Sequence, residues 1–154
     1  MQGEHIFQLK IYAEEGVFYR GDAIELILPC ADGEKAFLAH HETSVYSVSN
    51  GEMRFRVPVL KEGQTGDEDK VTDEWQEAVI GSGVVYFSDN TCTVLAETCE
   101  RPDEIDENRA RRALERAQER MQKQLSMREY RVSQMAMARA MARIRAVDHK
   151  KELG

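Results

Sequence analysis

A helical segment of this chain begins with Ile105-Asp106-Glu107-Asn108-Arg109-Ala110 and continues to Val147 without a glycine or proline. It is rich in arginine, alanine, methionine, glutamine and glutamate, which are good helix formers. Acidic residues, Asp103 and Glu104 among them, precede or open it, and negative charge is favourable at the N-terminal end of a helix dipole. The composition therefore predicts that the last third of the chain is helical.

A second helix start lies inside this segment, at Ser126-Met127-Arg128-Glu129. A serine followed three residues later by a glutamate is a capping box, in which the two side chains satisfy free amide groups at the start of a helix. The pattern predicts one helix over residues 103–125, with Asp103 as its N-cap. A second helix is expected over residues 127–147.

Apolar residues recur at intervals of three and four in both predicted helices, so each helix is expected to carry one apolar stripe. The stripes consist of Ala110, Ala113, Leu114, Ala117, Met121 and Leu125 in the first helix and Met135, Ala136, Ala140, Met141 and Ile144 in the second. Two such stripes can bury one another in an antiparallel hairpin. Because alanine and methionine make a shallow interface, we expect a hairpin of modest stability.

The residues before position 99 are predicted to form short strands separated by turns. The strand candidates are residues 6–12, 17–19, 24–28, 36–38, 45–48, 53–57, 75–80, 84–87 and 91–96. The dipeptides Asn50-Gly51 and Asp89-Asn90 suit hairpin turns, and Gly81-Ser82-Gly83 is expected to mark a bulge or a close approach of two backbones. Strands at this spacing predict an all-β sandwich or a small barrel.

This division predicts a β-sandwich domain at residues 1–98, a linker at 99–102 and a helical domain at 103–154. Residues 61–74 form an acidic run with two glycines, which is expected to be an exposed loop or hairpin tip. The first hundred residues carry 7 Lys and Arg against 19 Asp and Glu, whereas the rest of the chain carries 14 against 9. A basic tail on an acidic body favours an anionic partner, which leaves nucleic acid, nucleotide phosphate and an acidic protein surface open.

Two other functions are compatible with single features of the sequence. An arginine-rich helical tail can follow nucleic-acid phosphates, so a nucleic-acid-binding adaptor is the alternative function, although the chain as a whole has a net charge of −7. The tripeptide His40-His41-Glu42 could suggest an acid–base or metal site, but adjacent side chains of an extended chain point to opposite faces. We therefore assign no catalytic residue and no metal ligand.

Short motifs follow one another along almost the whole chain in a specific order and spacing. They are Phe7-Gln8-Leu9, Gly16, Phe18-Tyr19-Arg20-Gly21, Leu28-Pro29, Asp32-Gly33-Glu34, His41, Gly51, Gly81-Ser82-Gly83-Val84-Val85-Tyr86, Thr93-Val94-Leu95-Ala96, Ile105-Asp106-x-x-Arg109-Ala110 and Arg139-Ala140-x-x-Arg143-Ile144. Together they resemble the epsilon subunit of the F-type rotary ATP synthase. The chain departs from that family at His41-Glu42-Thr43, where His-Ala-Pro is usual, and in the length of the 61–74 run.

The resemblance implies a ten-stranded β-sandwich that binds the gamma subunit and the ring of membrane c subunits, followed by a regulatory helical hairpin. It implies a central-stalk subunit, not itself an enzyme, that couples the catalytic and membrane sectors of a proton-translocating ATP synthase. The extended hairpin would reach the catalytic alpha/beta hexamer and inhibit ATP hydrolysis. The protein would lie on the cytoplasmic face of a bacterial cell membrane, attached through the complex alone.

The resemblance also implies two sets of binding residues. ATP, as a regulatory ligand and not a required cofactor, would bind the folded hairpin through Glu100, Asp106, Arg109, Ala110, Arg139 and Arg143. Arginine forks suit phosphate oxygens, although the same charges could pair internally, Asp106 with Arg109 or Arg143. The candidate partner contacts are Glu34, His41, Arg128 and Arg131, of which the arginines would meet acidic residues of the catalytic subunits.

Overall fold

The computed structural model describes residues 5–59, 72–123 and 125–153, and these form ten strands followed by a short 3-10 helix and two α-helices. The strands are β1 (Phe7–Ala13), β2 (Gly16–Ala23), β3 (Glu25–Cys30), β4 (Gly33–Leu38), β5 (Ser44–Val48), β6 (Gly51–Val59), β7 (Thr72–Ile80), β8 (Gly83–Ser88), β9 (Thr91–Ala96) and β10 (Cys99–Glu100). The helical elements are η3 (Pro102–Glu104), α1 (Glu107–Met121) and α2 (Met127–Leu153). Most of the acidic run at 61–74 lies outside the described residues, and its end belongs to β7.

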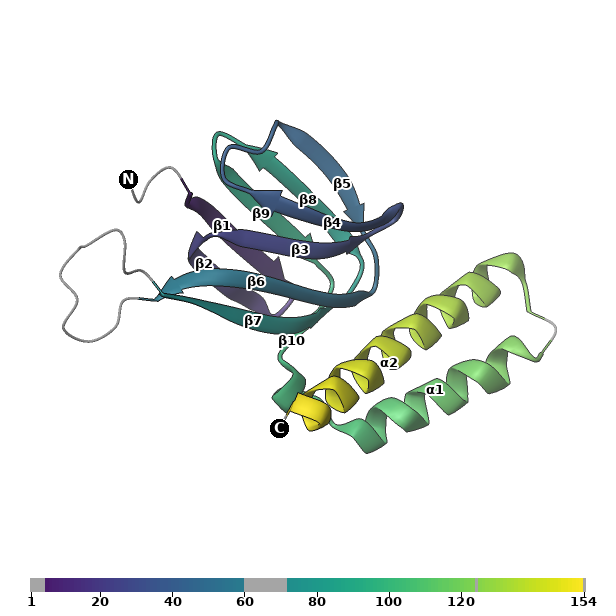
Figure 1. Ribbon diagram of the computed structural model, residues 1–154. Helices are drawn as coiled ribbons and strands as arrows, with labels where there is room; N and C mark the ends of the chain where they lie inside the picture. Colours follow the sequence, from purple (N-terminus) through teal and green to yellow (C-terminus); the bar gives the residue numbers. More distant parts are fainter. Residues whose placement is uncertain (1–4, 60–71, 124, 154) are drawn as a thin grey trace.

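The strands form one sheet that folds over on itself into a sandwich (Figure 1). Their order is β10-β7-β6-β3-β5-β8-β9-β1-β2, and β4 pairs with β3 outside this path. Among the described strands, β1 and β9 run parallel and the other pairs are antiparallel. The largest side chains in the core are Phe7, Leu9, Ile11, Leu26, Leu28, Phe37, Met53, Phe55, Ile80, Val85, Phe87 and Val94. The predicted all-β N-terminal sandwich is confirmed.

Strand β6 shows how the sequence produces this arrangement. Met53 and Phe55 are buried in the core, whereas Arg54 and Arg56 between and after them face outward, as the alternation predicts. Both guanidinium groups lie over the ring of Trp75 on β7, at 5.8 and 5.5 Å from its centroid. These cross-strand contacts join β6 to β7 on the outer face of the sheet.

The two predicted hairpin turns differ in outcome. At Asp89-Asn90 both residues have positive φ, 50° and 54°, and they join β8 to β9 as expected. The hairpin predicted at Asn50-Gly51 is wrong, because β5 and β6 do not pair with each other and β3 lies between them. Gly51 serves packing instead, since a Cβ on it would lie 3.0 Å from the ring carbons of Pro29.

The motif Gly81-Ser82-Gly83 marks a close approach of two backbones. A Cβ on Gly83 would overlap the carbonyl oxygen of Leu95 in β9, and one on Gly81 would lie 2.5 Å from Thr98 Oγ1. The N–H of Gly81 also donates to the Thr98 carbonyl at 2.8 Å. Glycine is therefore required at position 83 by the spacing of the strands.

The first α-helix begins at Glu107, later than its predicted start at residue 103. The three residues Pro102–Glu104 form the separate turn η3, and the residue after them is extended, with φ −85° and ψ 127°. Asp106 is the N-cap, because its Oδ1 accepts a 3.1 Å hydrogen bond from the backbone N–H of Arg109. The prediction that Asp103 caps this helix is therefore wrong.

The second helix begins at Met127, as the sequence predicts, whereas the first ends at Met121, before its predicted end at residue 125. Ser126 Oγ accepts a 3.2 Å hydrogen bond from the backbone N–H of Glu129. The second helix then continues to Leu153, beyond the predicted end at residue 147. The predicted linker at 99–102 is partly ordered as a strand, since Cys99–Glu100 pairs with β7. The helical hairpin is confirmed, with a longer second arm.

The hairpin contacts the sandwich through α2, which lies between α1 and strands β6 and β7 (Figure 1). Ala142 and Ala146 of α2 are buried against Val79 of β7, with Ile105 beside them. This cluster is separate from the core of the sandwich. The apolar contact between the two domains is therefore small.

The contact with the sheet explains why part of the predicted stripe on α2 is wrong. Met135 and Met141, which were expected inside the hairpin, are 41% and 40% exposed. Ser133 and Ala140, seven residues apart, are buried on one face of the helix, and Ala142 is buried on another. A single stripe does not describe α2, because the helix packs against both a helix and a sheet.

Candidate functional site

A cavity of about 620 Å³ lies where the chain passes from the sandwich into α1. Its lining residues are Ala13, Glu14, Glu15, Glu97, Thr98, Cys99, Glu100, Glu104, Ile105, Asp106, Arg109, Ala110, Ala113, Arg116 and Arg143. They come from the β1–β2 turn, the segment after β9, the start of α1 and the middle of α2. The volume is within the range of small-molecule sites, and both domains contribute to the wall.

The cavity contains most of the set predicted to bind ATP. It is lined by Glu100, Asp106, Arg109, Ala110 and Arg143. Arg139 does not line the cavity but lies one turn before Arg143 on α2. Its Nη1 is 3.7 Å from Oε2 of the lining residue Glu97. The fold thus places five of the six predicted residues in the wall of one cavity and the sixth, Arg139, beside the lining residue Glu97.

The arginines around the cavity differ in what they contact. Arg143 is held by Glu100, whose Oε1 lies 2.7 Å from Nη2 and 2.8 Å from Nε. Arg109 reaches Asp106 through its backbone N–H, and its guanidinium makes no ion pair within the described chain. Asp106 therefore caps α1 instead of pairing with the side chain of Arg109 or Arg143. The carboxylate that pairs with Arg143 is that of Glu100.

Of the lining residues that sequence reasoning did not predict, Arg116 and Glu97 bear most directly on a phosphate ligand. Arg116 lies two turns after Arg109 on the same face of α1, and no ion pair of its guanidinium is found in the described part of the chain. The seven-residue spacing could have identified it. Glu97 offers no such signal, because it reaches the cavity only when β9 is paired within the sheet.

The arginines of the cavity wall favour a phosphate ligand, whereas its carboxylates oppose one. Three arginines face six acidic side chains, and Ile105, Ala110 and Ala113 add an apolar surface. Guanidinium groups suit phosphate oxygens and the apolar surface suits a planar ring. The surplus of carboxylates raises the energy of any polyanion. Burial raises the pKa of Cys99 to about 12, so its thiol adds no negative charge near neutral pH.

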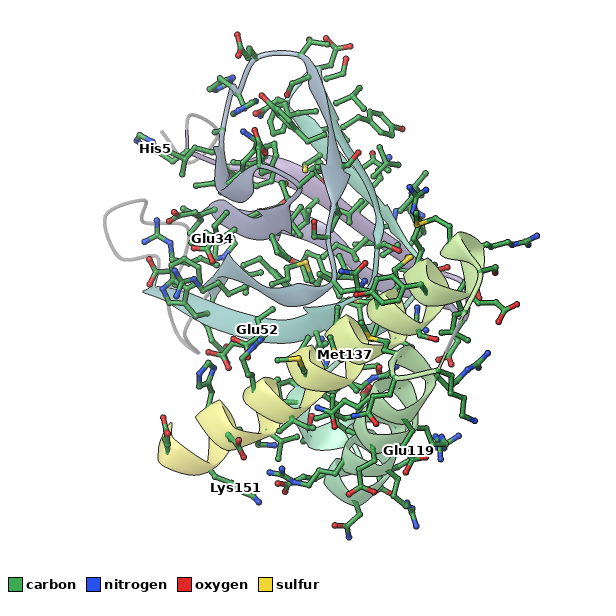
Figure 2. The ribbon with its side chains drawn as sticks, turned by 90° about the vertical axis from the view of Figure 1, so that its right-hand side faces the viewer. His5, Glu34, Glu52, Glu119, Met137 and Lys151 are labelled. Atoms are coloured by element: carbon green, nitrogen blue, oxygen red, sulfur yellow. The ribbon has the colours of Figure 1, made fainter. Side chains whose placement is uncertain are left out.

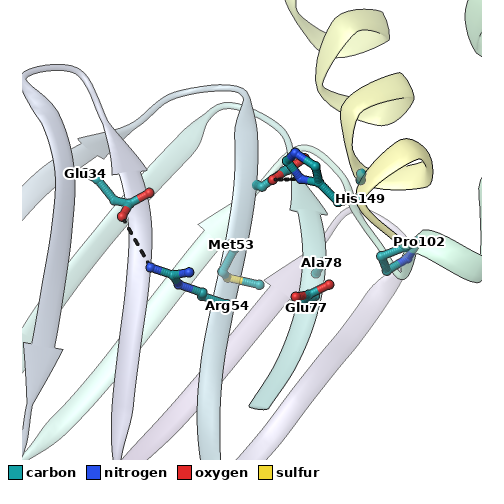
Figure 3. Close-up of a pocket in the computed structure, with 9 residues that line it drawn as sticks. Glu34, Met53, Arg54, Glu77, Ala78, Pro102 and His149 are labelled. Carbon is teal, nitrogen blue, oxygen red and sulfur yellow. Dashed lines mark hydrogen bonds and ion pairs between the residues drawn. The ribbon is translucent and has the colours of Figure 1, made fainter. Parts of the chain in front are cut away.

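A second, smaller cavity of about 220 Å³ lies between the sheet and the end of α2 (Figure 3). Glu34, a predicted partner contact, points toward Arg54 there and pairs with it at 3.7 Å. His149 Nδ1 lies 3.0 Å from Oε2 of Glu52 and joins α2 to β6. Figure 2 shows Glu52 on the sheet, facing the helix. Glu34 is therefore next to the docked end of the hairpin.

The other predicted partner contacts have different surroundings. The ring of His41 packs on Phe37 and Phe87, with centroids 5.0 and 5.4 Å apart, and Nδ1 is 2.8 Å from the Glu42 carbonyl oxygen. His41 thus orders its own loop. Arg128 and Arg131 are exposed in the first turns of α2 and make no ion pair within the described residues.

Ion pairs around Glu107 join α1 to α2 at the open end of the hairpin, where α1 begins and α2 ends. Glu107 Oε2 accepts a 2.6 Å hydrogen bond from Lys151 Nζ, and its Oε1 accepts one of 3.0 Å from Arg111 Nη2. The hydrogen bond from Lys151, followed by that from Arg111, lowers the pKa of Glu107 below its ordinary value. An ionised Glu107 therefore ties the start of α1 to the end of α2.

Two family models match the chain, and their boundary falls at the boundary of the two domains. The model for the beta-sandwich domain of the ATP synthase delta/epsilon chain matches residues 6–102, and the model for its long alpha-helix domain matches residues 103–148. In the described residues, no helix is long and apolar enough to cross a membrane. The fold is thus that of the two-domain delta and epsilon chains of ATP synthases.

Comparison with individual relatives narrows the class from delta and epsilon chains to epsilon chains. The ATP synthase epsilon chain of Ruminiclostridium cellulolyticum is 36% identical, over 94% of this chain and 98% of that one. The epsilon chain of Caldicellulosiruptor bescii is 31% identical, over 95% and 96%. The chain belongs to the family of F-type ATP synthase epsilon subunits.

Solved structures show the same fold at much lower sequence identity. A chain of the Euglena gracilis mitochondrial ATP synthase OSCP/F1/c-ring assembly matches with a TM-score of 0.68 and 17% identity, over 90% of this chain and 79% of that one. A chain of the Tetrahymena thermophila mitochondrial ATP synthase central stalk and c-ring matches with a TM-score of 0.59 and 12% identity, over 91% and 95%. The sandwich-and-hairpin architecture is therefore kept where few residues are identical.

Proposed function

We propose that the protein is the central-stalk subunit that couples the catalytic and membrane sectors of an F-type proton-translocating ATP synthase. The observation that carries this proposal is the likeness to epsilon chains over both the sandwich and the hairpin. The sandwich would bind the gamma subunit and the c ring, and its structural neighbours come from assemblies that include a c-ring. The protein would lie peripherally on the cytoplasmic face of a bacterial cell membrane, held there by these partners.

The hairpin would inhibit ATP hydrolysis by leaving the sandwich and extending into the catalytic alpha/beta hexamer. Its docking rests on the small cluster around Ala142 and Ala146 and on a few ion pairs at the surface. At roughly 25 cal/mol per Å², and after the cost of ordering, such a contact contributes on the order of a few kcal/mol. Partners can reverse a contact of that size. The exposed Arg128 and Arg131 would then meet acidic residues of the hexamer.

ATP would bind the cavity between the domains and hold the hairpin down. Arg109 and Arg116, whose guanidinium groups are not engaged by carboxylates of the described chain, would hold phosphate oxygens. Ile105 and Ala110 would cover the base. Because sandwich and hairpin both line the cavity, a bound ligand would favour the docked arrangement by mass action.

Truncation after residue 100 tests the inhibitory role, since β10 and the separate core of the sandwich are kept. The ATP synthase assembled with the truncated subunit is expected to hydrolyse ATP several-fold faster than the one with the full chain. Equal hydrolysis rates with both subunits would show that the tail does not inhibit.

Calorimetric titration with ATP tests the ligand. The full chain is expected to bind with a Kd in the micromolar to millimolar range, and Arg109→Ala is expected to weaken binding. Arg112→Ala is the matched control, because Arg112 is exposed on α1 and does not line the cavity. Absence of heat with millimolar ATP would remove the ligand from the proposal.

A further inference from the structure

Glu97 is a cavity residue that lies outside the predicted ATP-binding set, and the sandwich holds it in a defined position. Its backbone N–H donates to the Ser82 carbonyl oxygen at 3.0 Å, and its own carbonyl accepts from the N–H of Glu14 at 3.4 Å. Its side-chain Oε2 accepts a 3.3 Å hydrogen bond from the Ser82 hydroxyl. The sandwich therefore fixes the backbone of Glu97 and directs its carboxylate to the cavity wall.

Two carboxylates of the sandwich hold the two arginines of α2 that belong to the predicted ATP set. Glu97 Oε2 lies 3.7 Å from Arg139 Nη1, and Glu100 Oε1 lies 2.7 Å from Arg143 Nη2. The arginines are four residues apart, on one face of α2, so the two ion pairs bridge the domains next to each other. A carboxylate and a phosphate oxygen use the same guanidinium N–H groups and cannot both use them fully.

We infer that Glu97 is an internal competitor of the nucleotide, because its carboxylate engages Arg139 in the docked hairpin and lowers the affinity for ATP. The inference rests on the proposed function, since it concerns the same cavity. Arg109 and Arg116, which have no such competitor among the described residues, bind phosphate first, and Arg139 contributes only when Glu97 is displaced. The ion pair between Glu97 and Arg139 also holds the hairpin on the sandwich when no nucleotide is bound. Glu97 therefore determines how much further ATP can stabilise the docked hairpin.

Calorimetric titration of the full chain with ATP tests this competition. Glu97→Gln keeps the size of the side chain and an oxygen for the Ser82 hydroxyl but removes the charge that holds Arg139. It is expected to lower the Kd about three- to fivefold, the size expected for a partly exposed ion pair. Glu14→Gln is the matched control, because it removes one negative charge from the same cavity wall without freeing an arginine. Its Kd is expected to change by about twofold or less.

A double substitution separates competition from the general effect of charge. In an Arg139→Gln background, Glu97→Gln is expected to change the Kd by no more than the charge control Glu14→Gln does, because the arginine it would free is gone. An equal gain in both backgrounds, or an equal gain from Glu14→Gln, overturns the inference and leaves nucleotide binding intact. If none of the variants binds millimolar ATP, the proposed nucleotide site itself fails and the competition fails with it.

Hydrogen exchange without nucleotide gives an independent readout of the same ion pair. The α2 amides around Arg139 are expected to exchange faster in Glu97→Gln than in wild type, and at the wild-type rate in Glu14→Gln. Added ATP is expected to slow this exchange more in Glu97→Gln than in wild type. Identical exchange in the two variants would show that Glu97 does not hold the helix.

Discussion

The sandwich and the hairpin of this chain are stabilised by different kinds of contact. The largest fully buried side chains of the sandwich are Phe7, Phe37, Phe55 and Phe87, and the rings of Phe7 and Phe87 lie 5.6 Å apart. The buried residues of the two helices are Ala110, Ala117, Ser133, Ala140, Ala142, Ile144 and Ala146. A buried phenylalanine removes far more apolar surface from water than an alanine does, so most of the stabilising burial lies in the sandwich.

This difference suits the two tasks proposed for the chain. A subunit that transmits rotation would need a rigid body, and the phenylalanine-rich sandwich would supply one. A tail that changes position needs a docked state that partners can reverse, and alanine contacts with partly exposed ion pairs supply that state. The two parts should therefore respond very differently to substitutions of similar size.

The largest effect is expected from Gly83→Ala in the sandwich. The added methyl group would meet the carbonyl oxygen of Leu95 and lie 2.8 Å from the Cα of Ala96, and a backbone cannot move aside without separating β8 from β9. The free energy of unfolding should fall by about 3 kcal/mol or more. Urea unfolding followed through Trp75, the only tryptophan of the chain, reports on the sandwich alone.

Gly33→Ala is the control for this substitution. Gly33 has φ of +121° but open space around its Cβ direction, so only backbone strain of about 1–3 kcal/mol is expected. A loss for Gly83→Ala no larger than that for Gly33→Ala would show that the close approach of β8 and β9 is not what requires glycine.

A smaller effect, confined to the hairpin, is expected from Ala142→Leu. Ala142 is fully buried against Val79, so the larger side chain would push α2 away from the sheet at a cost of about 1–3 kcal/mol in docking. Hydrogen exchange of α2 should accelerate while the Trp75 unfolding midpoint stays the same. Met141→Leu, at an exposed position of the same helix, should change neither. Parallel loss of both signals would mean that the two regions unfold as one unit.

The sequence predicts the sandwich well because each strand carries its own alternation of inner and outer residues. Arg54 and Arg56 are outside, as predicted, since their orientation depends only on their neighbours in the chain. Predictions that depend on distant segments do less well. The hairpin at Asn50-Gly51 is wrong because β3 lies between the strands, and Met141 is exposed because α2 also packs on the sheet.

The residues of the candidate site show the same difference between predictions from local patterns and predictions that depend on distant segments. The fold brings Arg109 and Arg143 into the wall of one cavity, and Arg139, near the middle of α2, pairs with the lining residue Glu97. Glu97 could not be predicted, because it comes from a different domain and meets Arg139 only through the register of β9 and the docking of α2. Pairing between domains is set by tertiary structure, which local patterns do not contain.

An effect of opposite sign is expected from Ser133→Ala. The hydroxyl of Ser133 is buried and has no hydrogen-bond partner in the described structure, and such a group costs free energy. Alanine removes that cost and also favours helix, so the hairpin should become more stable by about 1 kcal/mol. Thermal unfolding of the helices, followed by circular dichroism, should shift upward, whereas Gln134→Ala at the adjacent exposed position should gain only the propensity difference. A downward shift for Ser133→Ala would mean that the hydroxyl is satisfied in solution.

The smallest effect is expected from acid, through Glu107. Its pKa is lowered in the folded hairpin by Lys151 and then Arg111, so its contribution is complete above the pKa of an unfolded glutamate, about 4.3, and is lost as the pH falls through the lower folded value. Helicity at low ionic strength should therefore decline below about pH 4.3, before Trp75 reports any change in the sandwich. Glu107→Gln should flatten this decline, whereas Glu115→Gln, which removes an exposed carboxylate of α1 without an ion pair in the described chain, should not. If Glu107→Gln and wild type lose helicity along the same pH curve, the ion pairs of Glu107 do not hold the two helices together.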